Sequence, residues 1–264
     1  MGAGNIVRID RQKVRRVFKE YVSSYNAEDE KIKLKIVHTY KVAEICERIS
    51  RSLGFSTEDV DLAWLMGMLH DIGRFEQVKQ YGTFDDSVSV DHAKFGVKIL
   101  FDEGMIREFV DDIQYDQLIS DAISYHNMFM IPEDITERTK SFSNILRDAD
   151  KIDILRVQVS SPLEKVYDIT TEELYNSEVT KEVVDSFMNA ETVLHSLRKT
   201  GVDNIIGRAA LVFGLNFKES FVITKEQGCL DKMMNFNSEN STTRKQFAVM
   251  RDFVNEFMAT KTEK

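Results

Sequence analysis

Apolar side chains recur three and four residues apart along most of this chain, a spacing that places them on one face of an α-helix. Only two prolines, Pro132 and Pro162, interrupt the 264 residues, so long helices are permitted almost throughout. The fold class is therefore predicted to be all-α. The first apolar stripe consists of Val14, Val17, Phe18, Tyr21, Val22 and Tyr25.

Helix signals and the position of Pro162 divide the chain into three parts. We expect an N-terminal helix within residues 1–27, packed on a helical-bundle core of residues 28–160, and then a helical extension of residues 161–264. Residues 226–240 are polar and are expected to form a loop. Helices are predicted at about 31–53, from the capping pair Ser56 and Asp59 to His70, and at 91–104, 112–126, 139–159, 180–199, 202–216 and 242–259.

The charge and the cysteine content exclude several classes of function. A net charge of −9 disfavours binding to a nucleic-acid polymer, but it leaves room for a small phosphorylated ligand in a local basic pocket. Two cysteines are too few for a disulfide framework, so we expect reduced thiols and a cytoplasmic protein. We also expect no membrane partner, because no apolar run approaches membrane-spanning length and the N-terminus lacks a signal-peptide pattern.

Several chemistry-bearing side chains occupy inward positions of the predicted helices. A single inward histidine is usually a core residue bonded to backbone, whereas an unpaired buried carboxylate costs several kcal/mol or becomes protonated. A bound cation removes that cost, so the set as a whole favours a metal site. The residues that share apolar stripes are His38, His70, His92, His126 and Asp150.

The adjacent pair His70-Asp71 closes an apolar run and precedes Gly73. Neighbours within a helix diverge by about 100°, so both side chains reach one cavity only where the helix ends and the backbone turns. A carboxylate at such a place can bridge two ions. Imidazole with carboxylate ligation suits Fe, Mn, Co, Ni or Zn better than Mg or Ca. The polar segment after Tyr81 is expected to be a loop beside this site.

These residues, in this order, resemble the HD-domain superfamily of metal-dependent phosphohydrolases over about residues 38–153. The resemblance rests on His38, His70-Asp71 and Asp150, while His92 and His126 are similar to the extra ligands of the subset with two metals. It implies an enzyme in which a metal-activated hydroxide cleaves a phosphoric ester or anhydride bond of a nucleotide or another small phosphate ester.

The resemblance also implies two divalent transition-metal ions, with Fe or Mn favoured and Co, Ni or Zn compatible. One ion would be held mainly by His38, His70 and Asp150. The other would be held mainly by His92 and His126, and Asp71 would bridge the two. The chain has Arg74 where many relatives have lysine, and it lacks the Gly-Tyr-Pro signature, which disfavours cyclic-di-GMP hydrolysis.

Basic residues near the expected ligands are candidates for stabilising phosphoryl charge. Arg74 and Lys151 are the first choices for catalytic groups beside Asp71, because each adjoins a ligand segment, and Arg147 is a third. Asp153 is a candidate for orienting a ligand histidine.

Two other functions fit the same ligands. One is a di-iron oxygenase on the HD scaffold, and the other is a non-catalytic regulatory module that binds a metal or ligand. Self-association into a homo-oligomer also stays open.

Overall fold

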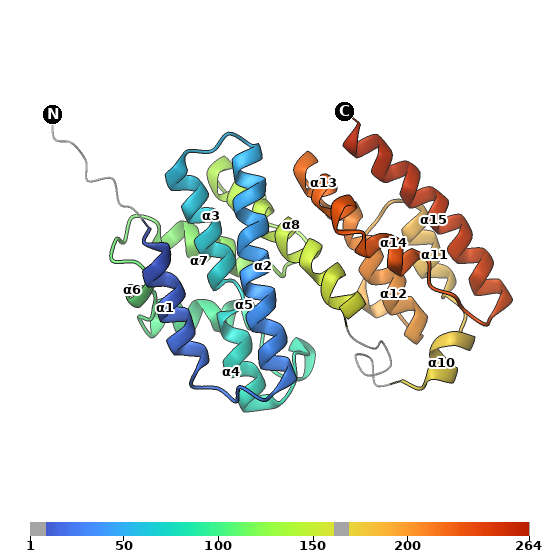
Figure 1. Cartoon of the computed structure of the whole chain (residues 1–264), viewed down its shortest axis with the longest axis horizontal. Helices are drawn as coiled ribbons and strands as arrows, with labels where there is room; N and C mark the ends of the chain where they lie inside the picture. The colour runs from blue at the N-terminus through green and yellow to red at the C-terminus, as the bar shows by residue number, and fades with distance from the viewer. Residues whose placement is uncertain (1–8, 161–168, 264) are drawn as a thin grey trace. The chain divides into compact units, whose positions relative to one another are not determined.

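The computed structural model describes residues 9–160 and 169–263. Every regular element within these ranges is a helix, which confirms the all-α prediction (Figure 1). The chain divides into two compact units, of which the first ends at Asp150 and the second begins at Lys151. This division lies inside a long helix, whereas the boundary suggested by Pro162 falls on residues outside the described ranges.

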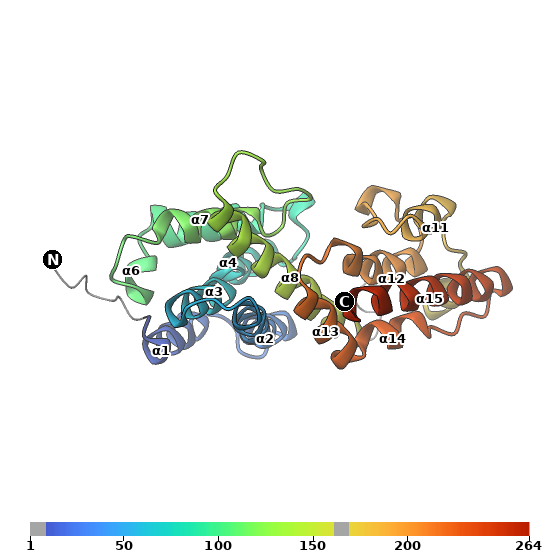
Figure 2. The same ribbon diagram turned by 90° about the horizontal axis from the view of Figure 1, so that it is seen from above.

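The first unit contains the predicted ligands, and Figure 2 shows its helices from a second direction. Within it, a 3-10 turn covers Asp86–Val88 and a π-helix covers Lys98–Asp102. Its α-helices are α1 (Arg11–Val22), α2 (Glu30–Ser52), α3 (Thr57–Leu69), α4 (Ile72–Tyr81), α5 (His92–Val97), α6 (Ile106–Phe109), α7 (Asp116–Tyr125) and the first part of α8 (Glu137–Ser160).

Short polar side chains begin these helices as expected from the sequence. The Ser56 side chain accepts a hydrogen bond from the backbone N–H of Asp59, so α3 starts where the capping pair predicted. Asp29 caps α2 in the same way, through the N–H of Lys31. Asp91 caps α5 and thereby sets the position of His92, the first residue of that helix.

Helix α3 is the centre of the first unit. Nearly every residue from Val60 to Leu69 is buried, which is the pattern of a helix covered on all sides. A Cβ atom on Gly67 would lie 2.6 Å from the Cα of Ala43 in α2, so only glycine allows the two backbones to approach this closely. The close approach brings the end of α3 beside the middle of α2, where His38 lies.

A second glycine sets the distance between α4 and α5. A Cβ on Gly73 would lie 2.5 Å from the carbonyl oxygen of His92 and 2.6 Å from the backbone nitrogen of Gly96. The backbone turn itself occurs at Asp71, whose φ of −104° and ψ of 17° separate α3 from α4. Gly73 therefore serves the close packing of α5 rather than the turn that the sequence suggested.

The second unit is also helical and has its own apolar core, which includes Phe187, Phe247 and Met250. The loop predicted for residues 226–240 is wrong in part, because Cys229, Leu230, Met233 and Met234 form a buried helical face. Among the described residues, no helix is both long and apolar enough to cross a membrane. The second unit begins with the last part of α8. Its other α-helices are α10 (Thr171–Asn176), α11 (Lys181–Met188), α12 (Gly201–Ala209), α13 (Lys218–Gln227), α14 (Cys229–Met234) and α15 (Ser241–Thr262).

Candidate metal centre

The six side chains predicted as metal ligands come together in the first unit. His38 comes from the middle of α2, and the His70-Asp71 pair lies at the junction of α3 and α4. His92 begins α5, and His126 directly follows α7. Asp150 is supplied by α8, at the end of the first unit. Four histidines and Asp71 are buried, and the Asp150 side chain is 17% exposed.

Two groups of donor atoms share Asp71. The first donor group consists of Nε2 of His38, Nε2 of His70, Oδ2 of Asp71 and Oδ1 of Asp150. The separations between these atoms run from 3.1 Å, between His38 and Asp150, to 3.8 Å, between His70 and Asp150.

The second donor group consists of Oδ1 of Asp71 and the Nε2 atoms of His92 and His126. Its separations run from 3.0 Å between the two imidazole nitrogens to 3.9 Å between His126 and Asp71. The two oxygens of one carboxylate thus face different groups, as a bridging ligand requires.

These separations match those of ligands around a transition-metal ion. A bond length of about 2.1 Å separates neighbouring ligands by about 3.0 Å in an octahedron and about 3.4 Å in a tetrahedron. Both donor groups therefore have the size of a coordination shell.

Hydrogen bonds fix which imidazole nitrogen faces each group. Nδ1 of His70 donates to the carbonyl of Gly67 at 2.8 Å, and Nδ1 of His126 donates to that of Ile123 at 2.7 Å. Nδ1 of His92 pairs with Oδ2 of Asp86 at 2.5 Å. In a neutral ring with its proton on Nδ1, Nε2 carries a lone pair. Neutral His92 and His126 would then point two lone pairs at each other across 3.0 Å, a repulsion that a cation removes.

The electrostatics of the site favour the metal-binding protonation state of His126, Asp71 and Asp150. Burial, together with the nearby His92 and His70, lowers the pKa of His126 to about 3, so this ring is neutral at pH 7. Burial alone would raise the pKa of Asp71, but Lys35 and the histidines outweigh it and hold the pKa well below its usual range. The pKa of Asp150 is likewise lowered, because the hydrogen bond and charge of His38 outweigh burial.

Lys35 is a site residue that the sequence reasoning missed. Its ammonium group donates to Oδ2 of Asp71 and lies 5.4 Å from the centre of the Phe84 ring. A signal was present, because Lys35 precedes His38 by three residues and so shares its face of α2. One lysine among several in this stretch did not stand out.

Arg74 lies beside Asp71. Its Nε is 3.6 Å from Oδ1 of Asp71, while its Nη1 donates to the carbonyl of Phe84 at 2.6 Å and to Oδ1 of Asp86 at 2.7 Å. Asp86 in turn orients His92, which makes it a second residue that was missed. The polar segment after Tyr81 does lie beside the site, since Phe84 and Asp86 belong to it.

The other basic and acidic candidates have partners elsewhere. Nζ of Lys151 donates to the carbonyl of Gly214 at 2.5 Å, within the second unit. Both carboxylate oxygens of Asp153 accept from Arg156, at 2.6 and 2.8 Å. The guanidinium of Arg147 donates to the backbone carbonyls of Tyr125, His126, Met128 and Phe129. The predicted contact of Lys151 with a substrate stays a prediction.

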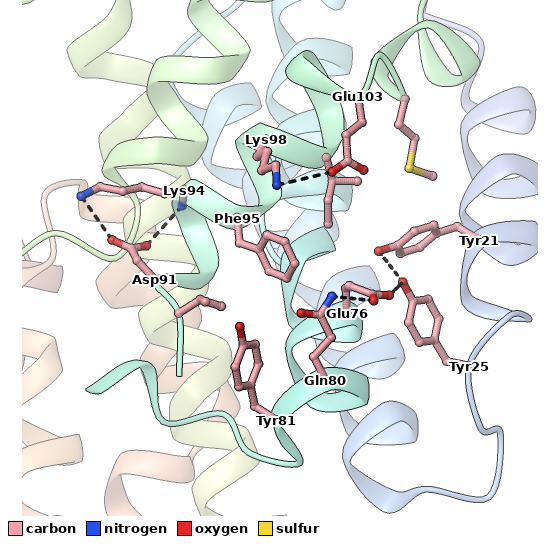
Figure 3. A pocket seen from close by; sticks show the side chains of 13 residues that line it. Tyr21, Tyr25, Glu76, Gln80, Tyr81, Asp91, Lys94, Phe95, Lys98 and Glu103 are labelled. Atoms are coloured by element: carbon pink, nitrogen blue, oxygen red, sulfur yellow. Dashed lines mark hydrogen bonds and ion pairs between the residues drawn. The ribbon is translucent and has the colours of Figure 1, made fainter. Parts of the chain in front are cut away.

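A cavity of about 790 Å³ lies elsewhere in the first unit (Figure 3). Its wall includes Tyr21, Tyr25 and Glu76, whose side chains form a hydrogen-bonded chain, and Phe95 from the same helix that carries His92. The lining contains none of the six predicted ligands. The donor groups around Asp71, rather than this cavity, therefore hold the chemistry that the sequence predicted.

Comparison with known proteins gives one match, to a family model. No curated protein and no solved structure matches the chain. Residues 36–157 match the family model of the HD domain, which spans α2 to α8 and therefore all six predicted ligands. Because the residue order expected of this superfamily and the gathering of those residues in space are both present, we conclude that residues 36–157 form an HD domain.

Proposed function

We propose that this protein is a metal-dependent phosphohydrolase that cleaves a nucleotide or another small phosphate ester. One observation carries the proposal: Asp71 presents one oxygen to each of two donor groups. Such an arrangement would let Asp71 help to hold two ions, and a pair of ions can stabilise both the attacking and the leaving oxygen in phosphoryl transfer. The superfamily consists mostly of metal-dependent hydrolases, which supports the same reaction class.

The residues would divide the work as follows. His38, His70 and Asp150 would hold one ion, His92 and His126 the other, and Asp71 both. When bound, divalent ions supply a Lewis acid for phosphoryl oxygens and lower the pKa of a water molecule. The nitrogen-rich ligand set suits Fe or Mn, and Co, Ni or Zn are compatible with it.

Positive side chains next to Asp71 support a phosphorylated substrate. Lys35 contacts one oxygen of Asp71, and Arg74 lies 3.6 Å from the other. Positive charges beside this carboxylate would stabilise the charge that develops on phosphoryl oxygens in the transition state. We assign Lys35 and Arg74 to this role, and Lys151 stays a candidate from the sequence alone.

The test is phosphate release by the full chain loaded with Mn²⁺ without oxygen. Metal content is measured by mass spectrometry, and the panel contains nucleotides, sugar phosphates and glycerol phosphate. The proposal expects two ions per chain and release of phosphate or a nucleotide product from at least one class. A fully loaded protein that releases neither from any class contradicts it.

Oxygen provides the contrast with the competing function. Substrate-dependent oxygen consumption that occurs only with iron would instead identify an oxygenase that uses the same ligands. Tight metabolite binding without any turnover would indicate a regulatory module. Activity with Mn²⁺ under anaerobic conditions excludes both of these alternatives.

A further inference from the structure

The cavity of about 790 Å³ in the first unit is separate from the two donor groups (Figure 3). Residues of α1, α4, α5 and the π-helix form its wall, together with the segments next to these helices. Sites for small organic molecules have volumes of about 300–1,000 Å³. The lining includes none of the six predicted ligands, so a molecule bound here would occupy a site of its own.

Aromatic rings form a large part of this wall. Tyr21 and Tyr25 have ring centres 5.2 Å apart, and Figure 3 shows the ring of Phe95 pointing from α5 into the same space. Tyr81, at the end of α4, adds a fourth ring and is 47% exposed. The face of an aromatic ring carries a negative potential, which attracts an ammonium or guanidinium group. Four rings in one wall therefore favour a positively charged organic ligand.

The carboxylate of Glu76 lies in the same wall. Its Oε2 accepts a hydrogen bond from the Tyr25 hydroxyl at 3.0 Å, and its Oε1 accepts one from Nε2 of Gln80 at 2.8 Å. Burial raises the pKa of Glu76, but the hydrogen bonds from Gln80 and Tyr25 outweigh burial and lower the pKa below its usual value. The wall therefore holds a negative charge at neutral pH, in an orientation that two hydrogen bonds fix.

The charges of the lining leave one carboxylate in excess. Its two lysines lie beside carboxylates next to them: Nζ of Lys94 is 3.7 Å from Asp91, and Nζ of Lys98 is 4.0 Å from Glu103. Among the described residues that line the cavity, Glu76 is a third carboxylate without a third lysine to match it. This excess negative charge favours a cation over an anion.

The protein itself places an ammonium group beside Glu76. Nζ of Lys79, which is outside the lining, is 3.3 Å from Oε2 of Glu76 and 5.5 Å from the centre of the Tyr25 ring. The Lys79 side chain is 60% exposed, so water competes for its charge and the pairing is weak. Glu76 and the Tyr25 ring are thus matched to an ammonium group, and a ligand that also fills the cavity makes contacts that Lys79 lacks.

We propose that this cavity binds an organic ammonium ion that has an apolar body. The ammonium group lies between Glu76 and the ring of Tyr25, and the body lies against the apolar side chains of Phe95 and Ile99. This binding site goes beyond the proposed phosphohydrolase function and does not depend on it.

Three probes with the same body test which charge the cavity selects. They are 4-phenylbutylamine, 4-phenylbutanol and 4-phenylbutyrate, which at neutral pH are a cation, a neutral molecule and an anion. Each is titrated into the full chain in the presence of Zn²⁺, which is diamagnetic, and the methyl signal of Met105 is followed by NMR. Met105 belongs to the lining, so a phenyl ring that enters the cavity shifts this signal.

The amine should saturate the Met105 shift with a Kd in the millimolar range or below, as expected for a ligand of this size. The alcohol should bind about fivefold more weakly, and the carboxylate more weakly still, because Glu76 and the rings attract only the cation. An equal Kd for amine and alcohol, a lower Kd for the carboxylate, or a shift that the amine does not saturate overturns the proposal.

Two substitutions of opposite charge should move the Kd of the amine in opposite directions. Glu76→Gln keeps the shape and removes the negative charge, so Kd should rise about fivefold. Lys79→Met removes a competing ammonium group from an exposed position, so Kd should fall about twofold or more. The matched control is Glu44→Gln, because Glu44 pairs with Lys41 at the same three-residue spacing outside the lining.

The control should leave Kd unchanged, and unfolding midpoints show whether each variant folds. If Glu76→Gln does not fold, Lys79→Met still tests the proposal, because its side chain is exposed. A higher Kd in Lys79→Met, or an equal change in the control, contradicts the proposal.

Two more comparisons locate the bound amine. Tyr25→Phe keeps the ring and should hold Kd within about twofold, whereas Tyr25→Leu removes the ring and should raise Kd about fivefold. Asp150→Asn alters a carboxylate of the first donor group and should leave Kd unchanged. Binding that Asp150→Asn abolishes and Glu76→Gln does not would place the amine at the donor groups and overturn the proposal. A protein that hydrolyses no phosphate ester but binds the amine as expected leaves this inference intact.

Discussion

Replacing Asp71 by asparagine tests the bridge directly, because it preserves shape and removes both charge and one ligand oxygen. An amide has one oxygen, so it can serve only one donor group, and its NH₂ then faces the other. The first donor group keeps the carboxylate of Asp150, whereas the second keeps only the imidazoles of His92 and His126 and no carboxylate. Removing one partner of a buried charged pair costs about 3–5 kcal/mol, which is about 10²- to 10³-fold or more in metal affinity.

The assay is metal titration followed by mass spectrometry of the dialysed protein. We expect Asp71→Asn to lose the ion of the second donor group and to bind the remaining ion more weakly. Asp61→Asn is the control, since Asp61 is a carboxylate of α3 that pairs with Arg11 at 2.7 Å and faces neither donor group. Unchanged stoichiometry and affinity in Asp71→Asn would refute the bridging assignment, and an equal loss of metal in the control would show that the effect is not specific.

Three further substitutions test the surroundings of the site. Asp86→Asn should weaken the second ion about 10- to 100-fold, because it removes the carboxylate that orients His92; unchanged binding in metal titration contradicts this. Gly73→Ala should lower the free energy of unfolding of the first unit by about 1–3 kcal/mol in urea unfolding, since its Cβ would meet backbone atoms 2.5 and 2.6 Å away. An unchanged free energy of unfolding would show that α5 shifts to admit the methyl group at no cost. In metal-free protein, His126 stays neutral when folded but takes up a proton near pH 6.5 when unfolded, so stability should fall by about 2 kcal/mol between pH 6.5 and 5, and His126→Gln should remove that part of the slope.

The gathering of the candidate ligands could be predicted because the spacing of apolar residues along a helix shows which of its faces points inward. His38, His92 and Asp150 each share a stripe with apolar neighbours, and the structure gathers them as that pattern required. The same logic gave the start of α3 from Ser56, because a cap bond joins residues only three apart. Local rules of this kind need no knowledge of the rest of the chain.

Contacts made by loops could not be predicted in that way. Asp86 lies in a segment without periodicity, and its pairing with His92 depends on how the loop returns to α5. Arg147 was expected to face a phosphate, but the carbonyls it contacts belong to a turn about twenty residues away. The helix at Cys229–Met234 was missed because its polar flanks outweighed a short buried face.

The position of Asp71 shows why backbone packing decides whether the ligands form a centre. Its carboxylate reaches both donor groups because α3 and α4 meet at an abrupt turn at Asp71. Gly67 before this turn packs against α2, and Gly73 after it packs against α5. Gly67 brings α3 against α2, and with it His70 to His38; Gly73 brings α4 against α5, and with it Asp71 to His92. A methyl group at either glycine would separate one donor group and leave the other intact. The two donor groups therefore depend on different helix contacts, and Asp71 lies at the junction common to both.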